Sequence, residues 1–165
     1  RVPVRHDFVW GKMAEYVITE RDMAFMDFSR PFEEIRSQLR YYLVWWSEPR
    51  AFRYRRRLVW NENWAWPRHC GLVAKERIIY KHYPCRSPKQ LQVRWETRQR
   101  SRALGFVGWK ENDEAFRQMV KASKDCLYDD GVSPLRFDEA VLPRHMENCP
   151  VRLLKSIMHR TGLWP

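Results

Sequence analysis

The turn from His82 to Gln90 contains the residues of this 165-residue chain whose types and spacing best suit chemistry. His82 ends a segment rich in β-branched and aromatic residues, and Ser87 followed by Gln90 has the spacing of a helix capping box. Free backbone N–H groups at the start of a helix attract anions, and Arg86 and Lys89 add positive charge there. The turn therefore predicts a phosphate site. In the alternative interpretation the cap is only structural, Arg86 is solvated and His82 packs in the core.

The helix that this turn would open carries arginines at a spacing of four residues. Arg94, Arg98 and Arg102 share one face of such a helix. Because guanidinium groups bind phosphate oxygens in a bidentate manner, this row would extend the phosphate site. The alternative is a solvated face, since Glu96 lies four residues before Arg100 and can pair with it.

A second basic row lies between residues 51 and 60, where Arg53, Arg55 and Arg57 occupy alternate positions. This alternation predicts a strand with a basic face. With the aromatic residues around it, the row also suits a nucleic-acid surface that combines stacked rings with phosphate contacts. A non-catalytic nucleic-acid-binding module is therefore the alternative function, although the sequence contains no RNP motif, zinc finger or helix-turn-helix pattern.

Acidic residues that could supply a catalytic base occur in two short clusters, although acidic residues at such positions more often form turns or helix caps. The sequence also lacks the G-x-S-x-G, H-E-x-x-H, P-loop and G-x-G-x-x-G patterns of other enzyme classes. The clusters are Glu20, Asp22 and Asp27, and Asp125, Asp129 and Asp130.

The composition favours a folded, basic protein. The content of 44% apolar and 15% aromatic residues argues against disorder, and the net charge of +11 attracts anions such as nucleotides, acidic lipids or nucleic acid. Four cysteines without a C-x-x-C pair fit reduced thiols, with two disulfides as the alternative. No window of 18 apolar residues predicts a transmembrane helix, and we expect a cytoplasmic location.

The residues that could do chemistry need a scaffold, and the sequence predicts one mixed α/β domain over residues 1–165 with about four helices and a small sheet. The strand that ends at His82 is expected to be central in that sheet. Caps, prolines and apolar periodicity mark the elements. Strands are predicted at residues 8–10, 16–19, 51–60 and 72–83, and helices at residues 31–46, 88–104, 112–126 and from Pro150 to Gly162, with a further helix-start pattern at Ser133-Pro134.

Residues 48 to 98 resemble the C-terminal part of bacterial family-2-type glycosyltransferases. Three segments carry the resemblance: Glu48-Pro49-Arg50-Ala51-Phe52-Arg53, then His82-Tyr83-Pro84-Cys85-Arg86-Ser87-Pro88-Lys89-Gln90, then Gln92-Val93-Arg94-Trp95-Glu96-Thr97-Arg98. The resemblance implies a GT-A fold, which is a Rossmann-like α/β sandwich. It also implies transfer of a sugar from a nucleotide-diphosphate sugar to a saccharide or other acceptor, with Mn²⁺ or Mg²⁺.

The resemblance also implies roles for single residues. His82 matches the C-terminal metal-contacting histidine of many GT-A enzymes, and Arg86 would hold the diphosphate. Asp22 is the candidate for the catalytic base. The sequence departs from the family because it has no Asp-x-Asp motif, so we expect the chain to be the rear part of a longer enzyme and inactive alone. The proposed diphosphate-binding set is Arg86, Ser87, Gln90, Arg94 and Arg98.

Overall fold

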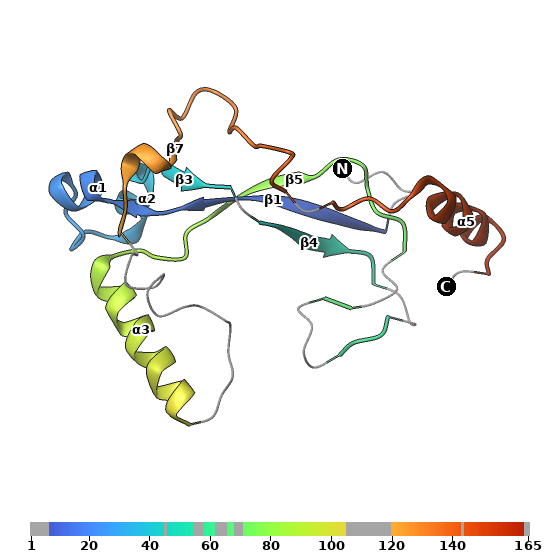
Figure 1. Cartoon of the computed structure of the whole chain (residues 1–165), viewed down its shortest axis with the longest axis horizontal. Helices are drawn as coiled ribbons and strands as arrows, with labels where there is room; N and C mark the ends of the chain where they lie inside the picture. Colours follow the sequence, from blue (N-terminus) through green and yellow to red (C-terminus); the bar gives the residue numbers. More distant parts are fainter. Residues whose placement is uncertain are drawn as a thin grey trace. The chain divides into compact units, whose positions relative to one another are not determined.

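Three other strands pair with β1 (Phe8–Tyr16) in the computed structural model (Figure 1). The structure describes residues 7–44, 46–54, 58–61, 66–67, 71–104, 120–142 and 144–163, except the side chains of Arg102 and His159. In these ranges the fold is mixed α/β with four α-helices and a mostly antiparallel sheet, which confirms the predicted class. The chain divides into two compact units, Arg1–Met13 with Val44–Tyr80 and Phe137–Pro165, and Ala14–Leu43 with Lys81–Arg136.

The first unit is built on the antiparallel pairing of β1 with β4 (Ser47–Phe52). The pairs run from Phe8↔Phe52 to Lys12↔Ser47, with a register shift between Val9 and Trp10. Val9 and Met13 are buried because alternate residues of a strand point to the same face. The unit also contains α5 (Cys149–Arg160) and Ile78–Tyr80 of strand β5 (Ile78–His82), which pairs with β1.

The second unit begins with the last residues of β1, which pair with β3 (Tyr41–Leu43) in the register Tyr16↔Tyr42. The largest side chains in its core are Tyr16 and Tyr42, each about 1% exposed. Strand β3 in turn pairs antiparallel with β7 (Leu127–Tyr128), and β2 (Ile18–Thr19) pairs parallel with β6 (Val120–Lys121). Its helical segments are α1 (Glu20–Phe25), α2 (Phe32–Gln38), α3 (Pro88–Ala103) and the 3₁₀ helix η1 (Ser123–Asp125).

Two predicted helices are confirmed almost to their ends. Helix α3 begins at Pro88 and stops at Ala103, as the Ser-Pro start and the apolar spacing indicated. Helix α5 is followed by Gly162 with φ of 71°, a left-handed conformation that glycine adopts without steric cost and that commonly ends helices. In the described residues no helix has both the length and the apolar character needed to cross a membrane.

The predicted helix over residues 31–46 is too long. Helix α2 ends at Gln38, and Tyr41–Leu43 form β3 instead. The apolar residues in this stretch recur at helical spacing, but Tyr42 has a buried place opposite Tyr16 in the sheet. Aromatic residues fit a pleated, half-buried surface well, so tertiary pairing overrides the helical pattern.

Several other predicted elements differ from those in the structure. Strand β1, which pairs with three strands, has the central place that was predicted for the His82 strand. That strand occupies only Ile78–His82 of the predicted 72–83, and β4 ends at Phe52, so the alternation of residues 51–60 does not continue as a strand through Arg53 and Tyr54. Residues 120–126 of the helix predicted at 112–126 contain β6 and η1, and residues 112–119 lie outside the described ranges, as do Arg55 and Arg57. No helix follows Ser133-Pro134 in the described loop.

Candidate functional site

The ends of β1 and β5 carry two sets of interacting polar side chains in the second unit, and Asp129 after β7 completes one of them. Nδ1 of His82 lies 3.4 Å from Oε2 of Glu15, and Nζ of Lys81 donates to Oδ2 of Asp129 at 2.6 Å. The hydroxyl of Tyr16 donates to the same Asp129 oxygen. We call these residues, Glu15, Tyr16, Lys81, His82 and Asp129, the His82 cluster. Because neighbouring residues of a strand point to opposite faces, the His82–Glu15 pair and the group of Lys81, Tyr16 and Asp129 are two separate sets of contacts within it.

The His82 side chain is 44% exposed, so it does not pack in the core, and the structural alternative for this residue is wrong. Its partner Glu15 is 16% exposed, which leaves the imidazole as the more accessible member of the pair. A partly exposed imidazole beside a carboxylate can bind a cation or an anionic ligand, depending on its protonation state.

Asp129 is the buried anchor of the cluster, with 4% of its surface exposed. Burial by itself raises the pKa of Asp129, but hydrogen bonds from Lys81 and Tyr16 outweigh burial and hold that pKa below its usual value. Burial, followed by the hydrogen bond to Asp129, raises the pKa of Tyr16. Asp129 is therefore the ionised acceptor and Tyr16 the protonated donor at neutral pH.

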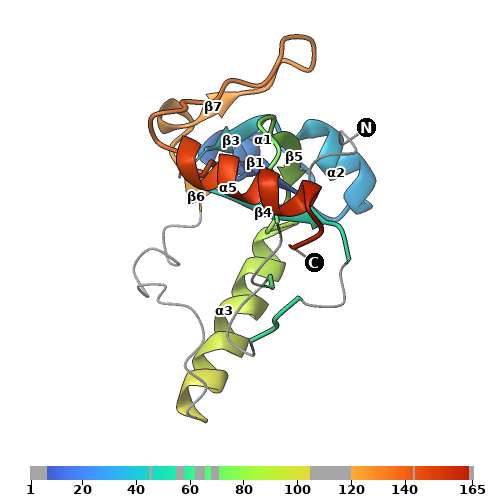
Figure 2. The same ribbon diagram turned by 90° about the vertical axis from the view of Figure 1, so that its right-hand side faces the viewer.

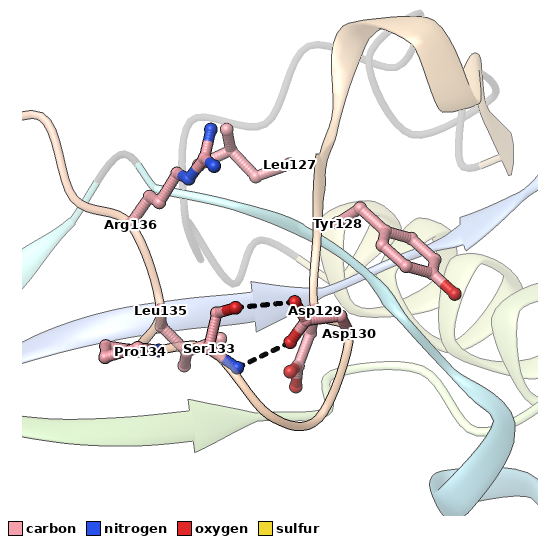
Figure 3. Close-up of a pocket in the computed structure, with 8 residues that line it drawn as sticks. All are labelled: Leu127, Tyr128, Asp129, Asp130, Ser133, Pro134, Leu135 and Arg136. Atoms are coloured by element: carbon pink, nitrogen blue, oxygen red, sulfur yellow. Dashed lines mark hydrogen bonds between the residues drawn. The ribbon is translucent and has the colours of Figure 1, made fainter.

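The loop after β7 positions Asp129. The neighbouring Asp130 accepts hydrogen bonds from the Ser133 N–H and hydroxyl, each at 2.7 Å (Figure 3). It also accepts from the Val132 N–H at 2.8 Å. The Ser133 hydroxyl and these N–H groups lower the pKa of Asp130 to about 2. The loop encloses a pocket of about 230 Å³. Since ligand pockets usually measure about 300–1,000 Å³, we assign this loop a positioning role.

Half of the predicted capping box at the start of α3 is present, and the Gln90 side chain accepts from Arg86 instead of from Ser87. The Gln90 N–H donates to Oγ of Ser87 at 3.2 Å, and Oε1 of Gln90 accepts from the Arg86 N–H at 2.8 Å. Two backbone donors are thus already satisfied within the turn, and Pro88 has none. The Lys89 N–H also lies in this first turn, and the Lys89 side chain is exposed.

Arg86 stacks on an aromatic ring and keeps an exposed side chain. Its guanidinium carbon lies 4.7 Å from the ring centre of Phe32 in α2. Phe32 meets Tyr83 edge-on, and Tyr83 stacks on Tyr16 with ring centres 4.6 Å apart. Because stacking uses the flat face of a guanidinium, the N–H groups in its plane keep their directions for an anion.

Arg94 and Arg98, which their spacing places on one face of α3, are both partly exposed. Nη1 of Arg94 donates to the Pro84 carbonyl and so closes the turn onto α3. Burial, then the neighbouring Arg94, lowers the pKa of Arg98, while burial raises the pKa of the nearby Cys85 thiol. These two arginines are partly buried against the turn, and the side chain of Arg102 lies outside the described residues.

Asp22 occupies a helix cap. Its Oδ2 accepts from the Thr19 N–H at 2.7 Å and from the Thr19 hydroxyl at 2.8 Å, and the residue is 6% exposed. This capping box at the start of α1 places Asp22 outside the His82 cluster. The role of Asp22 as a catalytic base stays a prediction.

The described residues contain no group of three or more His, Cys, Asp or Glu side chains that could hold a metal ion alone. His82 and Glu15 nevertheless provide one imidazole and one carboxylate, 3.4 Å apart and both reachable from solvent. Mg²⁺ on nucleotides is often held by one or two carboxylates together with phosphate oxygens and water. The pair fits as a partial set of protein contacts to an ion that a diphosphate also binds.

The comparisons with known proteins give no relatives from which roles could be transferred. No family model, curated protein or solved structure matches the chain. Sequence reasoning singled out His82 and the turn, but it missed Glu15, Tyr16 and Lys81. Lys81 could have been found from its position next to His82. No sequence pattern pointed to Glu15 and Tyr16, because they come close to His82 and Lys81 only through the pairing of β1 with β5.

Proposed function

We propose that the chain is the C-terminal part of a glycosyltransferase that transfers a sugar from a nucleotide-diphosphate donor to an acceptor. The observation that carries the proposal is the partly exposed His82 at the carboxyl end of β5, followed by the capped start of α3 with Arg86 and Lys89. The resemblance of residues 48 to 98 supports the same assignment. In this proposal the GT-A-like sandwich is completed by residues outside this chain.

Departure of the nucleoside diphosphate leaves negative charge on its phosphate oxygens, so the donor site needs positive charge and N–H donors. Arg86 supplies in-plane N–H groups on a guanidinium held by Phe32, and Lys89 adds a second charge. Arg94 keeps the turn against α3 and so positions Arg86. His82 and Glu15 would contact a divalent ion, which neutralises phosphate charge when it is bound.

The test is titration of the protein with UDP- and GDP-sugars, with and without Mn²⁺, and with single-stranded RNA. We expect selective, metal-dependent binding of one nucleotide sugar, and His82→Ala should remove the difference between the titrations with and without Mn²⁺. The thermal midpoint of His82→Ala should stay near that of the parent because the side chain is exposed.

Tight RNA binding that weakens steeply with salt, without nucleotide-sugar binding, would support the nucleic-acid-binding alternative instead. If Mn²⁺ does not change the affinity for nucleotide sugars, His82 and Glu15 do not act as metal contacts in the donor site.

A further inference from the structure

Figure 2 shows the course of helix α5. The exposed fractions of its apolar residues identify a face that the described part of the first unit does not cover. The exposed fractions are 42% for Val151, 64% for Leu153, 57% for Leu154 and 49% for Ile157. Residues 151, 154 and 157 are three apart and residues 153 and 157 are four apart, so these side chains form one continuous stripe on the helix.

The polar face of α5 is turned toward the protein. Nη1 of Arg152 lies 3.5 Å from the Val73 carbonyl oxygen, and Nζ of Lys155 donates to the Gly71 carbonyl oxygen at 3.2 Å. Lys155 also pairs with Glu147. An ordinary surface helix buries its apolar stripe and exposes its charges, whereas α5 turns Arg152 and Lys155 toward the protein and its apolar stripe outward. Its orientation is fixed by polar contacts that hold the apolar stripe outward.

The charge of the first unit is complementary to an anionic surface. Its segments contain fifteen Lys and Arg against seven Asp and Glu, which gives +8 of the chain's net charge of +11. Arg144 and Arg160, which lie just before α5 and at its last residue, are both exposed. Anionic lipid surfaces attract such basic segments within a Debye length.

A second copy of the chain is a weaker occupant for this face. A 12-residue helix is about 18 Å long and about 10 Å wide, so the area of the stripe is roughly 200 Å². A stable interface between proteins buries about 800 Å² per partner. A lipid bilayer accepts a stripe of this size because binding adds the apolar area to the attraction between basic residues and anionic headgroups.

We infer that α5 lies in the surface of an anionic membrane, with Leu153, Leu154 and Ile157 among the acyl chains. The helix would lie parallel to the bilayer, held to the protein by Arg152 and Lys155 on its other side. This inference does not depend on the proposed glycosyltransferase activity.

The experiment is flotation of the whole chain with vesicles of phosphatidylcholine alone and vesicles that contain phosphatidylglycerol. We expect binding to the anionic vesicles that weakens as salt is raised. The double variant L153S/L154S should lower the partition coefficient by about tenfold or more, because two apolar side chains leave the lipid phase. Val132→Ser is the matched control, since Val132 is 91% exposed in the second unit, and it should bind like the parent.

The thermal midpoint of L153S/L154S should fall only slightly, because both leucines are largely exposed in the free protein and serine is a somewhat weaker helix former than leucine. Three results would overturn the inference: no flotation with anionic vesicles at low salt, equal binding by L153S/L154S and the parent, or equal binding to neutral and anionic vesicles. A concentration-dependent dimer that L153S/L154S abolishes, without vesicle binding, would assign the face to a second copy.

Discussion

In the proposed donor site, Arg86 is the side chain expected to bind the diphosphate directly. The contact of Arg86 with the helix cap is made by its backbone N–H, which donates to Gln90. Its side chain contacts the Phe32 ring through the guanidinium and takes no part in the cap. We expect Arg86→Ala to weaken nucleotide-sugar binding by about 1.5–3 kcal/mol, the range for a hydrogen bond to a charged group. Calorimetric titration measures this loss.

Arg100→Ala provides the matched control for Arg86→Ala. Arg100 is an exposed arginine on the same helix, three turns away from the capping box, so its removal changes the net charge equally. Equal weakening in both variants would mean that only the overall positive charge attracts the ligand.

Asp129 has a different role, because it is buried and accepts from Lys81 and Tyr16. Asp129→Asn should lower the free energy of unfolding by about 1–3 kcal/mol, since the amide cannot replace a charged acceptor for both donors. The folded-state pKa of Asp129 is depressed, so its stabilisation is present above the unfolded pKa of about 3.9 and is lost as pH falls through the lower folded value.

Urea unfolding of the parent and Asp129→Asn between pH 7 and pH 2.5 measures both effects. The difference between the two proteins should shrink below about pH 4. Asp125→Asn, at an exposed aspartate of η1, should leave the free energy of unfolding nearly unchanged. A constant difference over the whole pH range would show that the ionised state of Asp129 does not stabilise the fold.

Among the elements, α3 depends most on its cap. Oγ of Ser87 accepts from the Gln90 N–H, and the helix carries many charged residues and little amphipathic character. Ser87→Ala should therefore lower the free energy of unfolding by about 1 kcal/mol. Ser101→Ala, in the last turn of the same helix, should change it little or raise it slightly because alanine is the better helix former. Equal losses in a urea titration would contradict the capping role.

Helix starts were predictable from the sequence because their signals are local. The capping contacts of α3 all lie within the five residues from Arg86 to Gln90, and Gly162 marks the end after α5. The site was only half predictable for the same reason. His82 and Arg86 lie within one turn, whereas Glu15 and Asp129 reach His82 and Lys81 through pairing of strands that are distant in sequence. A single sequence does not specify which distant strands pair, so β1 received no central role and Tyr41–Leu43 was assigned to a helix.

At the scale of the whole molecule, the two units differ in charge and in what they expose. The first unit carries +8 of the net +11 and the apolar face of α5, while the second contains the His82 cluster and the start of α3. The proposed lipid contact and the proposed donor site therefore lie on different units. A variant at α5 and a variant at Arg86 should change separate measurements, which makes the two proposals independently testable.

The cysteines of the two units differ in burial, so their rates of reaction with a thiol reagent test the structure of both units. Cys85, Cys126 and Cys149 are free, and Cys70 lies outside the described residues. Burial raises the pKa of Cys85 and of Cys126, and only Cys149 of these three is exposed. Since the thiolate is the reactive form, Cys149 should react with a disulfide reagent well before Cys85 and Cys126.

Thiol titration of the native protein near pH 8 measures this order. The Cys149→Ser variant should lose one thiol from the fast phase. After full denaturation, the slowly reacting thiols should react with the reagent as fast as free cysteine does. Cys126→Ser is the control, because it should remove a slow thiol and leave the fast phase intact. If Cys149→Ser leaves the fast phase unchanged, the N-terminal end of α5 is covered in solution, and its apolar face should then also fail to reach lipid.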